Sequence, residues 1–245
     1  MARYRAILSY DGTAYLGYQR QHDGQPTVQG EVEKVVAKLA QQPVTVYGAG
    51  RTDSGVHATG QVIAFDLNWR HETEALQNAL NAYLPADIKV REVAKTDDRF
   101  HPRFAARRRT YEYFVYNAPV ADPTKRLYSW HVTRALNLDL MNEAAALLVG
   151  VHDFGTFGTP PQGDSTVREI FAAGWQPAGD YLMFRVSANA FLYRMVRSLV
   201  GTLVAVGEQK WTVSQFAEAF YATDRTKAKM TAPAHGLFLV AVDYE

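Results

Sequence analysis

Two kinds of apolar spacing alternate along this chain, and their order limits the folds that it can adopt. Apolar residues recur at every second position in some segments, as in half-buried strands, and at intervals of three and four in others, as in amphipathic helices. In the first half, strands are expected at 4–10, 44–47, 61–67 and 88–93, and helices at 28–40 and 75–84. This β-α-β-β-α-β order is that of a ferredoxin-like domain.

The second half repeats this order with one helix added near its end. Strands are expected at 111–116, 168–175, 181–187 and 237–242, and helices at 138–149, 192–206 and 213–221. We therefore predict an α+β protein of two ferredoxin-like halves, 1–104 and 105–245, whose antiparallel or mixed sheets carry helices on one face. The stretch 151–166, rich in Gly, Pro and Thr, is expected to be a mobile surface loop.

The composition is that of a soluble globular enzyme, and it restricts the possible chemistry. Of the 245 residues, 47% are hydrophobic and 21% are charged, and no apolar run approaches the roughly 20 residues that cross a bilayer. The strand-like pattern begins at residue 4, so no signal peptide is expected and a cytoplasmic location is favoured. The absence of cysteine excludes disulfides and thiol catalysis, and the seven histidines lack the spacing of a metal site.

The most unusual segment is 48–58, which follows a strand and contains Gly48, Gly50 and Gly55 around one carboxylate, Asp53. Glycines allow tight backbone turns and close approach. Taken alone, the segment is more typical of a turn with a capping aspartate than of a catalytic loop. The segment does not fit a phosphate-binding loop, because Asp53 interrupts the Gly-x-Gly-x-x-Gly spacing and its negative charge would repel phosphate.

The expected helix 192–206 supplies a possible partner for this carboxylate. It is apolar on nearly all faces and therefore largely buried, yet it contains Arg194 and Arg197. A buried guanidinium needs a counter-charge, whereas a guanidinium that extends to solvent does not. If one of the two points inward, Asp53 is the carboxylate best placed by its surroundings to pair with it. That pairing would keep Asp53 ionised, which favours a nucleophile over a general acid.

A basic run lies close to the expected boundary between the halves. It contains no acidic residue and comprises Arg99, His101, Arg103, Arg107, Arg108 and Arg109, followed by Tyr111, Tyr113 and Tyr116. Such a run can be merely a solvated face. The net charge of the whole chain, +1, does not by itself indicate a nucleic-acid-binding protein. The neighbouring tyrosines favour RNA, because arginine can contact phosphate while an aromatic ring stacks on a base.

Several collinear motifs resemble the tRNA pseudouridine synthase A family over nearly the whole chain. The most specific is Ala49-Gly50-Arg51-Thr52-Asp53-Ser54-Gly55-Val56-His57-Ala58, which is similar to the family's active-site signature. Similar stretches begin at Tyr10, Phe104, His152, Ala188 and Ala232. One departure is Tyr18, where the family typically has tryptophan; the aromatic ring is retained.

The resemblance implies an isomerase that converts uridine to pseudouridine at positions 38 to 40 of the tRNA anticodon stem-loop, without cofactor or metal. It implies the pseudouridine synthase fold, with an RNA-binding cleft between the halves, and a homodimer. Asp53 matches the catalytic aspartate, Tyr111 the tyrosine that stacks on the target base, and Arg197 the arginine that pairs with the aspartate. The expected RNA contacts are Arg51, Arg103, Arg107 and Arg109, together with Tyr111.

The residues leave the chemical route open. The carboxylate of Asp53 can add at C6 of the base, act at C1′ of the ribose or remove the 2′ proton. Two other classes of function also remain open: a non-catalytic RNA-binding or chaperone-like module, and an enzyme that uses the Asp53 loop on a small molecule. The intact Asp53 motif argues against the first, and the second would show no salt-dependent affinity for RNA.

Overall fold

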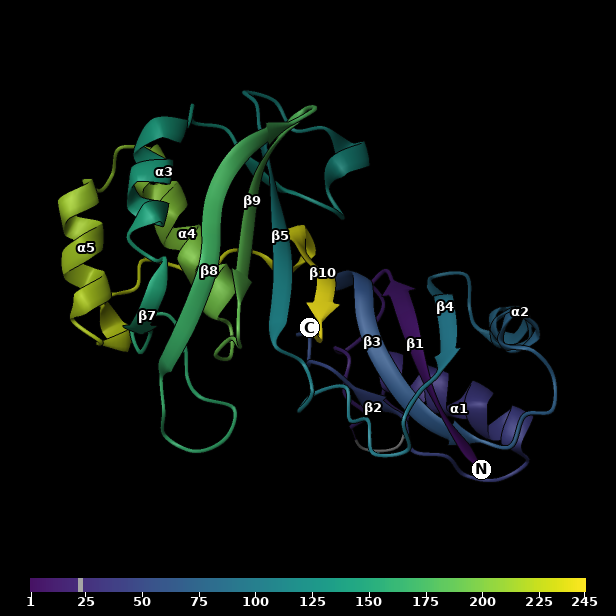
Figure 1. The fold of residues 1–245 in the computed structure, drawn as a ribbon. Helices are drawn as coiled ribbons and strands as arrows, with labels where there is room; N and C mark the ends of the chain where they lie inside the picture. Colours follow the sequence, from purple (N-terminus) through teal and green to yellow (C-terminus); the bar gives the residue numbers. More distant parts are fainter. Residues whose placement is uncertain (22–23) are drawn as a thin grey trace. The chain divides into compact units, whose positions relative to one another are not determined.

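The computed structural model describes residues 1–21 and 24–245, which form two units (Figure 1). Unit 1 consists of Met1–Arg107 together with Phe238–Glu245, and unit 2 of Arg108–Leu237. The division lies three residues after the expected one. The last eight residues also belong to unit 1, although the sequence placed them in the second half.

Unit 1 has a mixed sheet in the order β4-β1-β3-β10, with the short strand β2 paired to β3. Its elements are β1 (Ala2–Tyr10), α1 (Val28–Ala40), β2 (Tyr47–Gly48), β3 (His57–Leu67), α2 (Thr73–Tyr83), β4 (Ile88–Lys95) and β10 (Leu237–Asp243). Neighbouring strands are antiparallel except β10, which runs parallel to β3. The β-α-β-β-α-β order is therefore as expected, and β10 adds a strand from the distant end of the chain.

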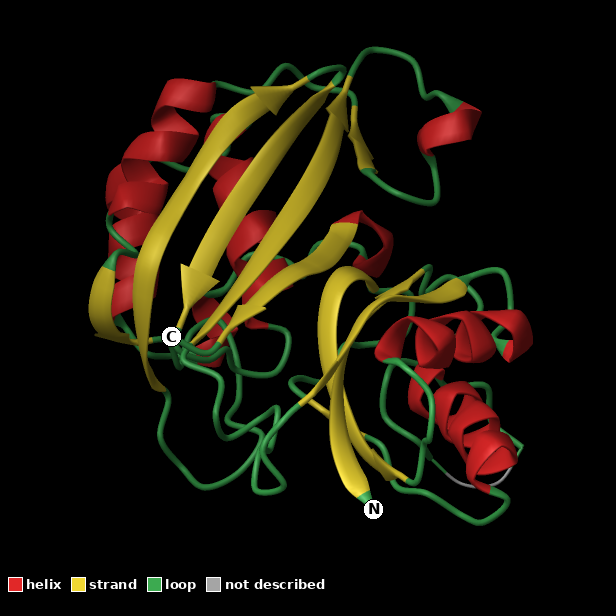
Figure 2. Cartoon of the chain, turned by 45° about the vertical axis from the view of Figure 1, so that its right-hand side comes forward, coloured by secondary structure: helices red, strands yellow, loops and turns green. Residues whose placement is uncertain are grey.

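The core of unit 1 follows from the two apolar spacings. Alternate residues of β1 are buried, beginning with Tyr4 and ending with Tyr10. Helices α1 and α2 lie on one side of the sheet (Figure 2), where Val32 and Val36 of α1 and Leu76 of α2 are buried. The side chain of Thr27 accepts a hydrogen bond from the Gly30 amide and caps α1, so the helix begins where the apolar spacing begins.

Unit 2 has a sheet in the order β5-β9-β8-β7, with β6 paired in parallel to β5. Its elements are β5 (Arg108–Asn117), η1 (Pro123–Lys125), β6 (Trp130–Val132), α3 (Leu138–Ala146), β7 (Gly150–Asp153), β8 (Val167–Ala178), β9 (Tyr181–Ala188), α4 (Met195–Gly207), α5 (Val213–Tyr221), η2 (Arg225–Lys227) and η3 (Ala234–Gly236). Helices α3, α4 and α5 cover one face of this sheet (Figure 2). The α+β fold class is therefore confirmed.

Two expectations for unit 2 need correction. The stretch 151–166 is not simply a loop: it begins within β7, and Phe154 and Phe157 are fully buried against Phe220 of α5. Burying these two rings offsets the cost of ordering a segment rich in Gly and Thr. The other correction concerns the closing strand 237–242, which joins the sheet of unit 1 beside β3 rather than that of unit 2.

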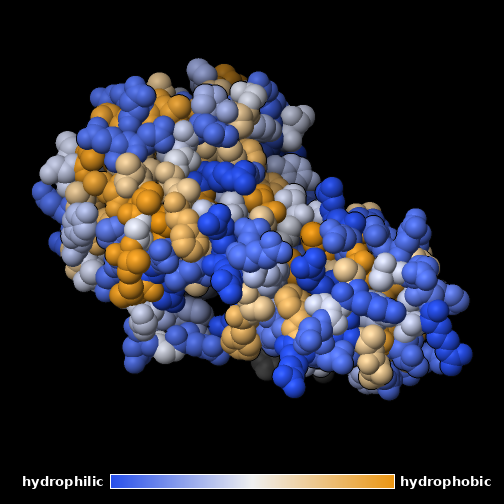
Figure 3. All heavy atoms as spheres, in the orientation of Figure 1, coloured by the Kyte–Doolittle hydropathy of each residue, from blue (hydrophilic) through white to orange (hydrophobic). Residues whose placement is uncertain are grey.

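Apolar side chains also reach the surface of unit 2. Figure 3 shows them gathered over β7 and the neighbouring part of β8. The large exposed hydrophobic residues of this region are Val149, Val151 and Val167. Within residues 1–21 and 24–245, none of the helices has both the length and the apolar character needed to cross a membrane.

Candidate active site

Asp53 lies in the connection between β2 and β3 of unit 1, at the start of a tight turn. The Val56 amide donates to the carbonyl of Asp53 at 3.1 Å and closes this turn. Gly55 adopts a φ of 76°, a left-handed conformation that favours glycine. The backbone on the C-terminal side of the carboxylate is therefore held in one conformation.

The segment 10–18 supports this loop through direct hydrogen bonds. The Tyr18 amide donates to the carbonyl of Thr52 at 3.0 Å, and the Ser54 hydroxyl donates to the carbonyl of Tyr15 at 3.1 Å. The Tyr10 hydroxyl lies 2.8 Å from Oγ1 of Thr52. The residues on both sides of Asp53 are thus anchored to the segment that follows β1.

Two glycines allow the segment and the loop to lie this close together. A Cβ atom on Gly12 would lie 2.0 Å from the carbonyl oxygen of Val56. A Cβ atom on Gly17, whose φ is 97°, would lie 2.8 Å from the carbonyl oxygen of Thr52. Real Cβ contacts are not this short, so a side chain at either glycine would displace the backbone that carries Asp53.

His57, at the end of the loop, is buried and contacts both the segment after β1 and strand β10. Its side chain is buried, and its Nδ1 accepts a hydrogen bond of 3.1 Å from the Gly12 amide. Its ring stacks on Phe238 of β10 with 4.6 Å between centroids. These contacts fix the point where the loop enters β3.

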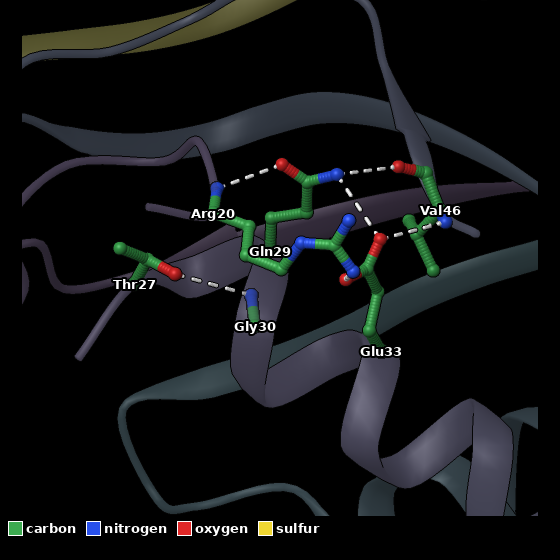
Figure 4. A network of polar contacts seen from close by, with 6 residues as sticks. All are labelled: Arg20, Thr27, Gln29, Gly30, Glu33 and Val46. Carbon is green, nitrogen blue, oxygen red and sulfur yellow. Dashed lines mark hydrogen bonds and ion pairs between the residues drawn. The ribbon is translucent and has the colours of Figure 1, made fainter. Parts of the chain in front are cut away.

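A polar network around Glu33 of α1 holds Val46, the residue before β2 (Figure 4). The buried carboxylate of Glu33 accepts from the Val46 amide at 3.1 Å, from Gln29 at 3.1 Å and from Nη1 of Arg20 at 2.9 Å. The Gln29 side chain also donates to the carbonyl of Val46 and accepts from the Arg20 amide. Glu33 and Gln29 thereby join the segment before α1 to the strand that leads into the Asp53 loop.

Tyr18 connects this network, which we call the Glu33 brace (Arg20, Gln29, Glu33 and Val46), to the loop. The Gln29 amide donates to the carbonyl of Tyr18 at 2.8 Å, while the Tyr18 amide holds Thr52. The buried ring of Tyr18 fills the space beside Gly48, where a Cβ atom would lie 2.5 Å from the ring. Burial raises the pKa of Tyr18 well above its usual value, so its hydroxyl stays neutral.

Tyr111 and Arg197, the other residues expected at the site, both lie in unit 2. Tyr111 is buried on β5, and its ring packs edge-on against Phe191 with 5.1 Å between centroids. Arg197 lies in the first turn of α4, and its Nε donates to the carbonyl of Ala232 at 2.8 Å. Tyr113, two residues along β5 from Tyr111, donates its hydroxyl to the carbonyl of Pro233 at 2.9 Å.

The structure distinguishes Arg197 from Arg194. Helix α4 begins at Met195, three residues later than expected, so Arg194 precedes it with a left-handed φ of 61°. Arg194 is exposed and lies over the ring of Tyr193. Arg197 is half-buried and fixed by backbone, as its own carbonyl also accepts from the Ala232 amide. Its pairing with Asp53, a residue of the other unit, stays a prediction.

The four arginines expected to contact RNA divide between the units. Arg51, Arg103 and Arg107 belong to unit 1, where Arg51 and Arg107 are exposed and Arg103 lies over the ring of Phe104. Arg109 belongs to unit 2, where its Nη1 donates to the carbonyl of Asn189 at 2.7 Å. Among residues 1–21 and 24–245, no group of three or more histidine, aspartate and glutamate side chains is arranged to hold a metal ion.

The sequence interpretation missed the Glu33 brace, although a signal for it exists. Gln29 and Glu33 are polar residues four positions apart on a helix whose other inward positions are valines. A buried carboxylate on such a face requires polar partners. That requirement indicates a network, but it does not identify Arg20 and Val46 as the partners.

Known proteins with similar sequences match the whole chain. The family model for tRNA pseudouridine synthase matches residues 6–105 and 144–245. The tRNA pseudouridine synthase A of Pseudothermotoga lettingae is 44% identical over 246 residues, with 100% of both chains covered. That of Maricaulis maris is also 44% identical over 246 residues, with 100% of this chain and 98% of the relative covered.

Among solved structures, a Cbf5-Nop10-Gar1 complex is matched with a TM-score of 0.35 and 14% identity, over 82% of this chain and 44% of the other. That likeness is too low for a comparison of folds. The sequence relationships need no such support, because they extend over the full length and include the Asp53 loop. The chain therefore belongs to the tRNA pseudouridine synthase A family.

Proposed function

We propose that this tRNA pseudouridine synthase acts at positions 38 to 40 of the anticodon stem-loop, as an intramolecular transferase with Asp53 at its reaction centre. The observation that carries the proposal is the rigid support of the Asp53 loop inside the family's motif. Hydrogen bonds anchor Thr52 and Ser54 on either side of the carboxylate. Such preorganisation is what a group that reacts in a fixed geometry requires.

The reaction breaks the bond between N1 and C1′, turns the uracil and joins C5 to C1′. The proton on C5 is then removed, and N1 gains a proton, so atoms and electrons balance within the substrate and water. No redox step occurs, and the proposal includes neither cofactor nor metal. Asp53 acts as the nucleophile or base, and either Asp53 or Tyr111 removes the final proton.

Arg197 is proposed to pair with Asp53 and to keep it ionised. Its Nε is already bound to the Ala232 carbonyl, which fixes the direction of the guanidinium. A bidentate arginine–carboxylate pair would use the remaining edge of this group. Tyr111 is proposed to stack on the target base, since its ring is already held edge-on by Phe191.

The target uridine must leave its stack, at a cost of a few kcal/mol. We propose that Arg51, Arg103, Arg107 and Arg109 offset this cost by binding phosphates of the anticodon stem-loop. We also propose, from the family, that two copies of the chain form a homodimer that works in the cytoplasm. Light scattering of the purified protein tests the dimer.

The decisive experiment replaces Asp53 by Asn. The variant keeps the shape of the side chain but loses its negative charge, so we expect it to fold while releasing no tritium from tRNA labelled at C5 of uridine. Asp139→Asn, on the exposed first turn of α3, is the matched control and should retain activity. Pseudouridine mapping in a defined transcript then identifies the modified positions.

Undiminished tritium release by Asp53→Asn would overturn the proposed role. An unmodified transcript that still binds the parent protein would favour an RNA-binding module. A protein without salt-dependent RNA affinity would instead favour an enzyme acting on a small molecule.

A further inference from the structure

Three rings of unit 1 form a continuous row that ends at the surface. The rings of Tyr47 and His101 are 5.2 Å apart between centroids, and those of His101 and Phe104 are 4.4 Å apart. Phe104, at the end of the row, is 75% exposed. We call Tyr47, His101 and Phe104 the aromatic ladder.

A guanidinium lies at each end of the ladder. The Cζ atom of Arg3 is 5.6 Å from the centre of the Tyr47 ring, and that of Arg103 is 5.7 Å from the centre of the Phe104 ring. Rows of aromatic rings with arginines beside them suit single-stranded nucleic acid, because bases stack on the rings while cations bind the backbone.

The Tyr47 end of the ladder is anchored through Arg3 of β1. The Nε and Nη2 atoms of Arg3 donate to the two carboxylate oxygens of Asp66 at 2.9 and 2.7 Å. Its Nη1 donates to the carbonyl of Phe100 at 3.0 Å, which ties the turn carrying His101 to the sheet. The fork geometry fixes the plane of the guanidinium next to Tyr47.

The turn at the other end is equally well ordered. The Arg103 amide donates to Nδ1 of His101 at 3.2 Å, and the Ala105 amide donates to the carbonyl of His101 at 3.0 Å. The Tyr244 hydroxyl donates to the carbonyl of Pro102 at 3.0 Å. Burial, with Arg3 and Arg103 nearby, holds the pKa of His101 below its usual value, so the imidazole is neutral at pH 7.

The fixed position of the Phe104 ring is not explained by packing in the core of unit 1. A ring that stays 75% exposed contributes little apolar burial to folding, yet hydrogen bonds and ring contacts hold it in one place. Tyr83 of α2 provides a contrast: it is also exposed and lies 3.7 Å from a cation, Nζ of Lys38, but it is a single ring outside any row.

We propose that the exposed face of Phe104 is a stacking platform for an unpaired nucleobase of the RNA substrate, apart from the base that is isomerised. The partner, tRNA, is taken from the proposed function. Tyr47 precedes Asp53 by six residues, so the chain can separate them by at most about 22 Å. Phe104 lies beyond Tyr47 by two ring-to-ring steps of 5.2 and 4.4 Å, so these distances leave room for several nucleotides between the stacked base and the target uridine.

The test compares Phe104→Leu with Phe104→Trp in the full-length protein, using a defined tRNA transcript. Leucine keeps the apolar bulk but removes the aromatic face, so the Kd should rise about 5- to 150-fold, the range that stacking of one base supplies. Tryptophan should retain the parent Kd, and the emission that it adds to that of the four native tryptophans should be quenched when tRNA binds. Tyr83→Leu is the matched control and should leave the Kd unchanged.

The salt dependence of binding separates stacking from phosphate contact. Phe104→Leu should leave the slope of log Kd against log salt concentration as in the parent, because no cation is lost. An unchanged Kd or a flattened salt slope for Phe104→Leu would overturn the proposal. A change in the mass of this variant in light scattering would also overturn it, because the ladder would then be a contact between protein chains. If Asp53→Asn retained activity, the proposed catalytic role would fail while the binding result for Phe104 still stood.

Discussion

The two units hold their candidate site residues by different means. In unit 1, Asp53 lies in a loop fixed by backbone hydrogen bonds, by close approach at Gly12 and Gly17 and by the buried carboxylate of Glu33. In unit 2, Tyr111 and Arg197 lie on a strand and a helix whose positions come from apolar packing. A reactive group in a loop thus needs a dedicated polar support, whereas one on a regular element inherits its position from the core.

This difference predicts that activity is lost most when a glycine beside the Asp53 loop in unit 1 is replaced. Gly12→Ala would place a Cβ atom 2.0 Å from the Val56 carbonyl oxygen, so the loop must shift. A displacement of about 1 Å at a catalytic group can lower the rate by about 100-fold. We expect the kcat for pseudouridine formation to fall by about that factor, as measured by tritium release.

Gly174→Ala in β8 is the control for this experiment, since its Cβ atom would have no contact shorter than 3.6 Å. Its kcat should be close to that of the parent. Equal activity of the two variants would show that the loop tolerates displacement, and the comparison between the units would lose its basis.

The next largest effect is expected in unit 2, at Arg197. Arg197→Met removes the charged donor to the Ala232 carbonyl and should lower the free energy of unfolding by about 1.5–3 kcal/mol, together with activity. Arg194→Met, at an exposed position, should change it by less than about 0.5 kcal/mol. Urea unfolding measures the free energy of unfolding of both variants, and tritium release measures their activity. Equal losses of stability and activity in the two variants would show that Arg197 is not the arginine that pairs with Asp53.

The smallest of the three effects is expected for Glu33→Gln, which tests whether the brace serves the loop. The variant keeps the side-chain shape, but its one carbonyl oxygen can accept either from Arg20 or from Gln29 and Val46, and the other donors then face its NH₂ group. This mismatch should cost about 1–3 kcal/mol of unfolding free energy. If the brace positions Asp53, kcat should fall while the KM for tRNA changes little.

Glu31→Gln on the same helix removes an exposed pair with Lys34 and should alter neither stability nor kcat. A loss of stability in Glu33→Gln without any loss of kcat would show that the brace supports the fold alone. Glu33→Asp, which restores the charge, should recover part of the rate if Glu33 is a positioning residue.

Much of the fold could be predicted because it depends on local periodicity. The strands around 4–10, 61–67 and 181–187 and the helix 28–40 follow from spacings of two and of three to four residues. The sequence also predicts the closing strand 237–242, but it does not predict the strand with which it pairs. Pairing of β10 with β3 joins positions about 180 residues apart, and its register depends on contacts that periodicity does not contain.

The candidate site divides in the same way. The sequence by itself determined the family, the motif around Asp53, the choice of Tyr111 and Arg197 as candidates, and the absence of thiol chemistry. Only the tertiary structure decided that His57 is a support, that Arg194 lies outside α4 while Arg197 lies on it, and that Phe154 and Phe157 belong to the core. It also revealed the Glu33 brace and the aromatic ladder. The physical reason is that a motif records which groups are present, whereas burial, hydrogen-bond partners and close approach arise only when distant segments pack together.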